Sequence, residues 1–226
     1  MVHYIFSDKT GTLTQNIMEF KRFSVGKFSY GRLEPKPAEY AAGVTNVNFE
    51  DQIFFDHLND GSHENNENIM RYLECLGLCH TIIPENKNDE KLGSYINYNA
   101  SSPDELALVN AARHFGFSFT ERDENQCMVV ENRILGSVQK FELLNVIEFD
   151  SARKRMTVIV KTPEDKIMVI CKGADSIIEK RLRKDHDYLK ISNEYLEEYA
   201  NTGLRTLMIA YKYVDSDYYA DWNTKF

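Results

Sequence analysis

The chain has 226 residues, of which 42% are hydrophobic, 12% aromatic and 27% charged. This composition is typical of a globular protein and excludes global disorder, and no apolar run approaches the roughly 20 residues that a bilayer-spanning helix needs. With 27 Lys and Arg against 35 Asp and Glu, the net charge of −8 has the wrong sign for binding nucleic acid or anionic lipid through a general field. An anionic ligand therefore needs a local site of placed cations.

The four cysteines lie in apolar stretches, and the N-terminus has no secretory signal pattern, so we expect a reducing, cytoplasmic setting for Cys75, Cys79, Cys127 and Cys171. Cys75, Cys79 and His80 resemble part of a zinc site, but no second ligand pair stands at zinc spacing. Burial in the core is the favoured interpretation, because cysteine is among the most buried residue types.

The first hundred residues predict a strand, a hairpin and two helices. An apolar run from Val2 to Phe6 stops at Ser7 and Asp8, which indicates a buried strand that leads into a loop. Weak alternation on both sides of Gly26 predicts a hairpin. The other expected elements are a loop over 31–48, helices over 49–58 and 64–80, and a polar, mobile surface connection over 84–93.

The clearest helix start is at Ser102. A serine cap, Pro103 at the first helical position and Glu105 three residues after the cap form a capping-box pattern, and the helix should end near Gly116. Strands are then expected over 127–130, 141–149, 156–161 and 166–172, helices over 175–184 and 188–201, and a last strand over 206–214. Neighbouring strands joined by tight turns favour antiparallel pairing, so the predicted fold class is α+β, an antiparallel sheet flanked by helices.

Asp8 stands where the first apolar run ends, a position at which ligands collect in α/β sheets. A carboxylate there can act as a covalent nucleophile toward a phosphoryl group, provided that a cation and backbone donors offset the approaching charge. Lys9 can supply the cation, and residues 10–12 can supply N–H groups and hydroxyls, with Gly11 allowing close approach. The alternative for an isolated Asp-Lys-Thr is a helix cap followed by turn-forming threonines.

The whole run over residues 8–14, DKTGTLT, resembles the phosphorylation motif of P-type ATPases, and Gln15 and Asn16 resemble the phospholipid-translocating subfamily, the flippases. Further segments look like the flippase versions of the nucleotide-binding motifs: 101–109 (SSPDELALV), 149–156 (FDSARKRM), 171–175 (CKGAD) and 203–207 (GLRTL). Cation pumps would usually show a Lys-Gly-Ala-Pro-Glu type sequence at the position of Lys172.

The resemblance implies an ATP site made of Glu105, Phe149, Ser151, Lys172 and Arg205, together with Asp8, Lys9 and Thr10 from the phosphorylation motif. Each residue also has a simpler explanation. Phe149 could belong to the core, Glu105 to the capping box and Ser151 to a turn. By composition alone, Lys172 and Arg205 would be solvated surface cations. Among related enzymes the counterpart of Phe149 stacks on adenine, and the counterpart of Glu105 approaches its amino group.

The same resemblance divides the chain into residues 1–16, a strand fragment of a haloacid-dehalogenase-like phosphorylation domain, and residues 17–226, a nucleotide-binding domain. It implies Mg²⁺ held by Asp8 and the carbonyl of Thr10, and an aspartyl phosphate at Asp8. It also implies a multi-pass membrane parent whose cytoplasmic domain this is, a phospholipid substrate and an accessory transmembrane subunit. We expect the isolated chain to bind ATP without turnover, since the later motifs of the phosphorylation domain do not occur in this sequence.

Other classes of function stay open at this point. A stand-alone phosphohydrolase of the haloacid dehalogenase type also has an aspartate after an apolar strand, but it commonly carries a second Asp two positions later, where this chain has Thr10. A cation-transporting P-type ATPase domain and a pure binding module are the remaining alternatives.

Overall fold

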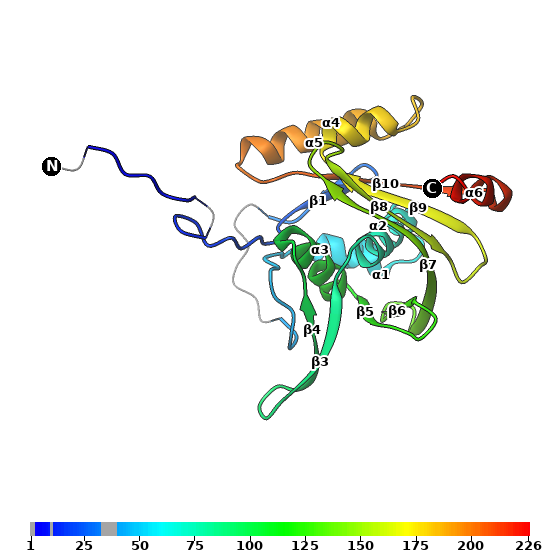
Figure 1. The fold of residues 1–226 in the computed structure, drawn as a ribbon, viewed down its shortest axis with the longest axis horizontal. Helices are drawn as coiled ribbons and strands as arrows, with labels where there is room; N and C mark the ends of the chain where they lie inside the picture. Colours follow the sequence, from blue (N-terminus) through cyan, green and yellow to red (C-terminus); the bar gives the residue numbers. More distant parts are fainter. Residues whose placement is uncertain (1–2, 10, 33–39) are drawn as a thin grey trace.

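A computed structural model describes residues 3–9, 11–32 and 40–226 of the chain. It has an α+β architecture in which a six-stranded antiparallel sheet lies among helices, with two small hairpins beside it (Figure 1). The strands are β1 (Phe23–Val25), β2 (Phe28–Tyr30), β3 (Ile83–Asp89), β4 (Gly93–Asn99), β5 (Phe117–Arg122), β6 (Cys127–Asn132), β7 (Ser137–Asp150), β8 (Arg155–Lys161), β9 (Ile167–Gly173) and β10 (Met208–Val214). The helices are α1 (Gln52–Asn59), α2 (Asn66–Leu78), α3 (Pro103–His114), α4 (Asp175–Ile178), α5 (Leu189–Asn201) and α6 (Ser216–Asn223).

The large sheet has the strand order β10-β9-β8-β7-β6-β5, and all its neighbours pair antiparallel. Short turns join successive strands from β5 to β9, as expected for such pairing. Its centre is β8, where five consecutive residues from Met156 to Val160 are buried. This run is rich in β-branched residues, which pack well on a pleated surface that is covered on both faces.

The helices α2 and α3 contact each other and β5, and they cover one part of the sheet, whereas α4 contacts β9 and β10 (Figure 1). An aromatic cluster fills the space among β1, α1 and α3. Its centre is Phe23, whose ring stacks on Tyr72 at a centroid distance of 4.7 Å. The cluster also contains Phe20, Tyr30, Phe49, Phe54 and Phe115. Burial of these rings is a large part of the hydrophobic stabilisation of this region.

Most predicted elements are confirmed, including the hairpin at Gly26, the two helices before residue 80, four strands of the sheet and the last strand. The helix after Ser102 begins and ends as expected, with the Ser102 hydroxyl accepting from the N–H of Glu105. The predicted helix over 175–184 is shorter: α4 ends at Ile178 and one 3-10 turn, Glu179–Arg181, follows it. Residues 33–39 of the expected loop over 31–48 lie outside the described residues.

Two predictions are wrong. The apolar run Val2 to Phe6 forms no strand over its described part, and Ile5 and Phe6 are almost fully exposed, because none of the described segments pairs with it. A strand needs such a partner to satisfy its backbone N–H and C=O groups. The polar stretch 84–93 is not an irregular connection but most of the β3–β4 hairpin, which projects from the body (Figure 1).

Strand β5 and helix α6 were not predicted. Among the described residues, no helix combines the length and the apolar character that crossing a bilayer requires.

Candidate functional site

The register of the sheet brings distant segments together at one end. Asp150 pairs with Arg155, Arg155 with Gly173, and Gly173 with Met208. The predicted site residues Phe149, Lys172 and Arg205 are within three positions of this row along the chain. Four neighbouring strands, whose site residues are up to about sixty positions apart in sequence, thus place these side chains at the same end of the sheet. Local sequence patterns could not show that they lie together.

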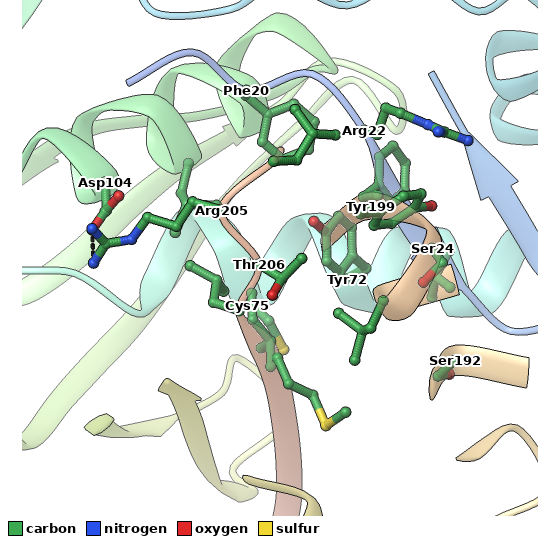
Figure 2. A pocket seen from close by; sticks show the side chains of 18 of the residues that line it. Phe20, Arg22, Ser24, Tyr72, Cys75, Asp104, Ser192, Tyr199, Arg205 and Thr206 are labelled. Atoms are coloured by element: carbon green, nitrogen blue, oxygen red, sulfur yellow. Dashed lines mark ion pairs between the residues drawn. The ribbon is translucent and has the colours of Figure 1, made fainter. Parts of the chain in front are cut away.

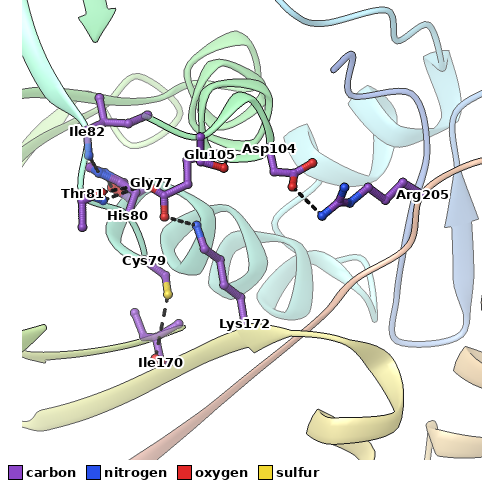
Figure 3. Close-up of polar contacts among 11 residues, drawn as sticks. Gly77, Cys79, His80, Thr81, Ile82, Asp104, Glu105, Ile170, Lys172 and Arg205 are labelled. Carbon is purple, nitrogen blue, oxygen red and sulfur yellow. Dashed lines mark hydrogen bonds and ion pairs between the residues drawn. The ribbon is translucent and has the colours of Figure 1, made fainter. Parts of the chain in front are cut away.

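The centre of the site is an ion pair between Lys172, the second-last residue of strand β9, and Glu105 in the first turn of α3. The Nζ atom of Lys172 lies 3.0 Å from Oε1 of Glu105, and each side chain is only 10% exposed (Figure 3). The other carboxylate oxygen of Glu105, Oε2, accepts from both the backbone N–H and the hydroxyl of Thr81, each at 3.0 Å. The capping-box explanation of Glu105 is therefore incomplete: Ser102 caps the helix, but the carboxylate turns to Lys172 and Thr81.

These contacts determine the charge state of Glu105. Burial acts to raise the pKa of the carboxyl, but the ammonium of Lys172 and the donors on Thr81 outweigh it, so the pKa is lowered from its ordinary value. The carboxylate is thus ionised at neutral pH. A buried ammonium has three N–H donors, and among the described residues Glu105 is the one ionic partner of Lys172 and no neutral group completes its hydrogen bonding. Unfilled donors on a buried cation are suited to an acceptor on a ligand.

His80 lies beside this pair and is completely buried. Its Nδ1 accepts from the N–H of Ile82, so Nε2 carries the ring proton and donates to the carbonyl of Gly77 at 2.9 Å. Burial and the charge of Lys172 lower the pKa of His80 to about 3. The imidazole is therefore neutral and structural, and the described residues hold no cluster of His, Cys, Asp and Glu suited to a metal ion. Burial of Cys75 and Cys79 confirms the core interpretation for these two thiols.

A second ion pair joins the residue before Glu105 to the predicted phosphate-binding arginine. Nη2 of Arg205 lies 3.0 Å from Oδ2 of Asp104, and the arginine side chain remains 66% exposed (Figure 3). Because solvent screens such a pair, its net contribution to stability is small. Arg205 is thus anchored on α3 while its guanidinium stays open to further anionic partners.

Phe149, the second-last residue of β7, and Ser151, the first residue of the β7–β8 turn, lie on either side of Asp150. Phe149 is 62% exposed, so it does not belong to the core, and Ser151 is exposed as well. The turn is ordered by Asp150, whose Oδ1 accepts from the N–H groups of Ala152 and Arg153, and these bonds lower the pKa of its carboxyl. An exposed phenylalanine beside a well-ordered turn is available for stacking with a planar ligand.

This turn is held against the end of β9. The N–H of Ala174 donates to the carbonyl of Lys154, which has a left-handed backbone conformation with φ of 51°. A Cβ atom at Gly173 would lie 2.4 Å from that same carbonyl oxygen. Only glycine permits this close approach, and it places the turn next to Lys172.

A large cavity opens beside the Asp104–Arg205 pair (Figure 2). It continues between α2, α5 and the strand β10, and the residues around it include Phe20, Tyr72, Cys75, Ser192, Tyr199, Thr206 and Leu207. Its walls combine apolar and aromatic side chains with basic ones, among them Arg71 and Lys212, and the charged groups labelled in Figure 2 lie at its margins. The polar site at the sheet end and this cavity meet at Arg205.

The structure does not bring Asp8 of the phosphorylation motif to this site, although Lys9 and Thr14 are among the residues that line the neighbouring cavity. Asp8 and Lys9 are exposed on the N-terminal segment, which runs out from the body (Figure 1). Thr10, the other predicted metal ligand, lies outside the described residues. Sequence reasoning missed Thr81 and Asp104, which hold Glu105 and Arg205, because no local signal marks a residue whose role is a contact across the fold.

Comparison with known proteins agrees with this arrangement. The family model described as P-type ATPase, cytoplasmic domain N, matches residues 68–225. The chain is 40% identical over 98% of its length to phospholipid-transporting ATPase ID of Mus musculus, and 38% identical over its whole length to phospholipid-transporting ATPase IC of the same organism. It is 40% identical over its whole length to phospholipid-transporting ATPase C887.12 of Schizosaccharomyces pombe.

The chain spans less than a fifth of these relatives: 19% of the first and 18% of each of the other two. The match to domain N covers more than half of the chain and includes the six-stranded sheet with the Glu105–Lys172 pair at its end. The chain therefore belongs to the P-type ATPase family and contains the cytoplasmic domain N of such an enzyme.

Proposed function

We propose that this chain is the ATP-binding domain of a phospholipid-transporting P-type ATPase and that ATP binds where β7, β8, β9 and β10 end together. The observation that carries the proposal is Lys172, a buried ammonium with one carboxylate partner and unfilled donors, beside an exposed phenylalanine. Buried cations with spare donors are costly without a ligand. The phospholipid-transporting relatives support the choice of enzyme class over a stand-alone phosphohydrolase.

Each residue has a distinct role in this proposal. The ring of Phe149 stacks on the adenine, a contact that contributes about 1 to 3 kcal/mol per base in other proteins. Lys172 donates to an acceptor of the nucleotide, and Glu105 accepts from the adenine amino group. Ser151 contacts the nucleotide from the β7–β8 turn. Arg205 binds phosphate oxygens, for which its planar fork of donors is suited.

For the whole enzyme we propose phosphoryl transfer to Asp8. A bond forms between a carboxylate oxygen of Asp8 and the γ-phosphorus, the bond from that phosphorus to the bridging oxygen breaks, and ADP leaves with the electron pair. Lys9 offsets the negative charge that builds up at the carboxylate. Magnesium is proposed at Asp8 and Thr10, but the described residues form no cluster of ligands for it, so no step is assigned to the metal.

In this proposal, residues 1–16 belong to the phosphorylation domain and residues 17–226 to the nucleotide-binding domain. The parent is a multi-pass membrane protein that moves phospholipid between leaflets with an accessory transmembrane subunit, and this domain faces the cytoplasm. The isolated chain binds ATP and does not turn it over. Sustained ATP hydrolysis by the pure chain that is abolished by Asp8→Asn would contradict this last point.

Titration of the 226-residue chain with ATP, followed by NMR and calorimetry, tests the site. We expect chemical-shift changes around Phe149, Lys172 and Arg205, and an affinity that Phe149→Ala lowers by about tenfold, consistent with the loss of one stacking contact. Phe226→Ala is the matched control, because Phe226 is 66% exposed and lies at the C-terminus, beyond α6 and outside the proposed site. An ATP affinity that Phe149→Ala leaves unchanged would overturn the adenine assignment.

A further inference from the structure

We infer that Thr81 is a positioning residue for the nucleotide: it fixes one oxygen of the Glu105 carboxylate and so leaves the other for the ligand. This inference rests on the proposed function and deepens it, since it names a residue outside every motif of the chain as a determinant of base selectivity. Thr81 does not itself reach the ligand, and it acts through Glu105.

The hydrogen bonds of Glu105 divide cleanly between its two oxygens. Oε2 accepts from the N–H and the hydroxyl of Thr81, both at 3.0 Å, and both of its in-plane lone pairs are thereby used. Oε1 has one partner among the described residues, Lys172 at 3.0 Å. One acceptor position on Oε1 is therefore left, and Oε1 is the carboxylate oxygen that contacts Lys172 (Figure 3).

Thr81 is held in place from both sides along the chain. The neighbouring residues His80 and Ile82 are completely buried. The ring of His80 bridges the segment, since it donates to the carbonyl of Gly77 and accepts from the N–H of Ile82. The connection between α2 and β3 is thus fixed by its own hydrogen bonds, and the hydroxyl and N–H of Thr81 form a rigid two-donor fork.

This geometry has a consequence for the choice of base. A carboxylate oxygen that can only accept favours the amino group at position 6 of adenine and repels the carbonyl oxygen at the same position of guanine. Without the threonine hydroxyl, the carboxylate loses one of the three contacts that fix its orientation, and its charged form loses a stabilising hydrogen bond. Both changes weaken the discrimination between ATP and GTP more than they weaken the contacts to the phosphates.

The test compares Thr81→Val, which keeps the shape and the backbone N–H but removes the hydroxyl, with Thr81→Ser, which restores it. Calorimetry gives the affinities of both nucleotides, and carboxyl-carbon NMR gives the pKa of Glu105 in the nucleotide-free chain. We expect Thr81→Val to weaken ATP binding by about 5- to 20-fold, which is toward the lower end of the loss of a hydrogen bond to a charged group, because the backbone N–H of residue 81 still holds Oε2. GTP binding should change less, the pKa of Glu105 should rise, and Thr81→Ser should recover all three readouts.

A double-mutant cycle separates positioning from a general structural effect. In a Glu105→Ala background, Thr81→Val should no longer change the ATP affinity, because there is no carboxylate left to orient. Should the valine variant fail to fold, Thr81→Ala is measured in its place, with thermal unfolding recorded for every variant.

The outcomes are distinct. If the unaltered chain binds ATP but Thr81→Val leaves the ATP affinity, the ratio to GTP and the Glu105 titration unchanged, the role of Thr81 is refuted and the proposed function stands. An equal loss of affinity in the Glu105→Ala background refutes it too, because the effect then bypasses the carboxylate. If the unaltered chain binds no ATP, the proposed function fails and the ligand role of Thr81 fails with it, whatever the titration of Glu105 shows.

Discussion

Arg205 is held by Asp104, with Nη2 and Oδ2 3.0 Å apart, and Asp104 immediately precedes Glu105 on the first turn of α3. The acidic pair 104–105 therefore binds both cations that we assign to the nucleotide, Lys172 through Glu105 and Arg205 through Asp104 (Figure 3). In the nucleotide-free chain, the Asp104 carboxylate contacts the Arg205 guanidinium, to which we propose that a phosphate of the nucleotide binds. Binding of a phosphate at Arg205 has to compete with it.

Removal of this competitor should strengthen nucleotide binding. We expect Asp104→Asn to increase the affinity for ATP by about 2- to 5-fold, because the exposed pair is worth at most about 1 kcal/mol and the freed guanidinium is then available to phosphate. Adenosine, which has no phosphates, should bind equally to both proteins. Calorimetry with ATP and adenosine checks this, and a weaker ATP affinity in Asp104→Asn would count against a phosphate contact at Arg205.

Substitutions of Lys172 and Glu105, the buried ion pair, should have strongly non-additive effects on the unfolding free energy. Lys172→Ala leaves the Glu105 carboxylate buried without its cation, and loss of one partner of a buried pair costs about 3 to 5 kcal/mol of unfolding free energy. The double variant Lys172→Ala, Glu105→Ala should be destabilised by much less than the sum of the single changes. Urea denaturation of the four proteins measures the coupling, and additive effects would show that the pair is not energetically linked.

His80 should make the unfolding free energy of the chain decrease as the pH is lowered. Its pKa is about 3 in the folded chain against an ordinary 6.5, so the unfolded state binds the proton first as the pH falls below 6.5. The contribution of His80 to the unfolding free energy is complete above pH 6.5 and declines toward pH 3 by about 1.4 kcal/mol per pH unit. His80→Asn still offers an acceptor to the N–H of Ile82. It should reduce the dependence of the unfolding free energy on pH by about 1.4 kcal/mol per pH unit, the value for one proton.

Glu105 contributes in the same direction over a lower range. Its pKa is lowered in the folded chain, so its stabilisation is complete above the ordinary pKa of 4.5 and is lost as the pH falls through the folded value. Urea denaturation between pH 4 and 7 separates these two groups, because an unfolded histidine titrates near pH 6 and an unfolded glutamate does not. Burial also lowers the pKa of His57 and His114, but these two residues contribute equally to the slope in the original chain and in His80→Asn, so the difference between the two proteins reports His80. A slope near pH 6 that is identical in the original chain and in His80→Asn would disprove the assignment to His80.

Gly173→Ala should disturb the site through the β7–β8 turn. The added Cβ would meet the Lys154 carbonyl at 2.4 Å, and a backbone atom cannot move aside cheaply. We expect a loss of about 1 to 3 kcal/mol in unfolding free energy, as for overpacking, and weaker ATP binding because the turn next to Phe149 shifts. Gly61→Ala is the matched control, since its Cβ would meet nothing within 4 Å. Equal stability and affinity in both variants would contradict this account.

Several elements were predictable because their signals are local. The Ser102-Pro103 start of α3, the turn around Gly26 and the β-branched run of β8 depend on residues close in sequence, and all three are confirmed. The β3–β4 hairpin was misread because β3 is polar and almost entirely exposed, so it lacks the apolar alternation that marks a half-buried strand, whereas β4 buries Tyr98. The opposite error at Val2 to Phe6 arose because an apolar run indicates a strand only where a partner strand is present.

For the candidate site too, the sequence predicts some features and only the fold determines others. The sequence by itself determined the types of groups that are present, including Glu105, Phe149, Lys172 and Arg205, and the motifs that carry them determined the resemblance to P-type ATPases, which the match to domain N confirms. Only the tertiary structure decided which groups meet. The contacts of Thr81 with Glu105 and of Asp104 with Arg205 arise across the fold, and they depend on strand register and on the packing of α3 near β9. Local patterns carry no information on such contacts, because burial and hydrogen bonding between distant segments exist only once the chain has folded.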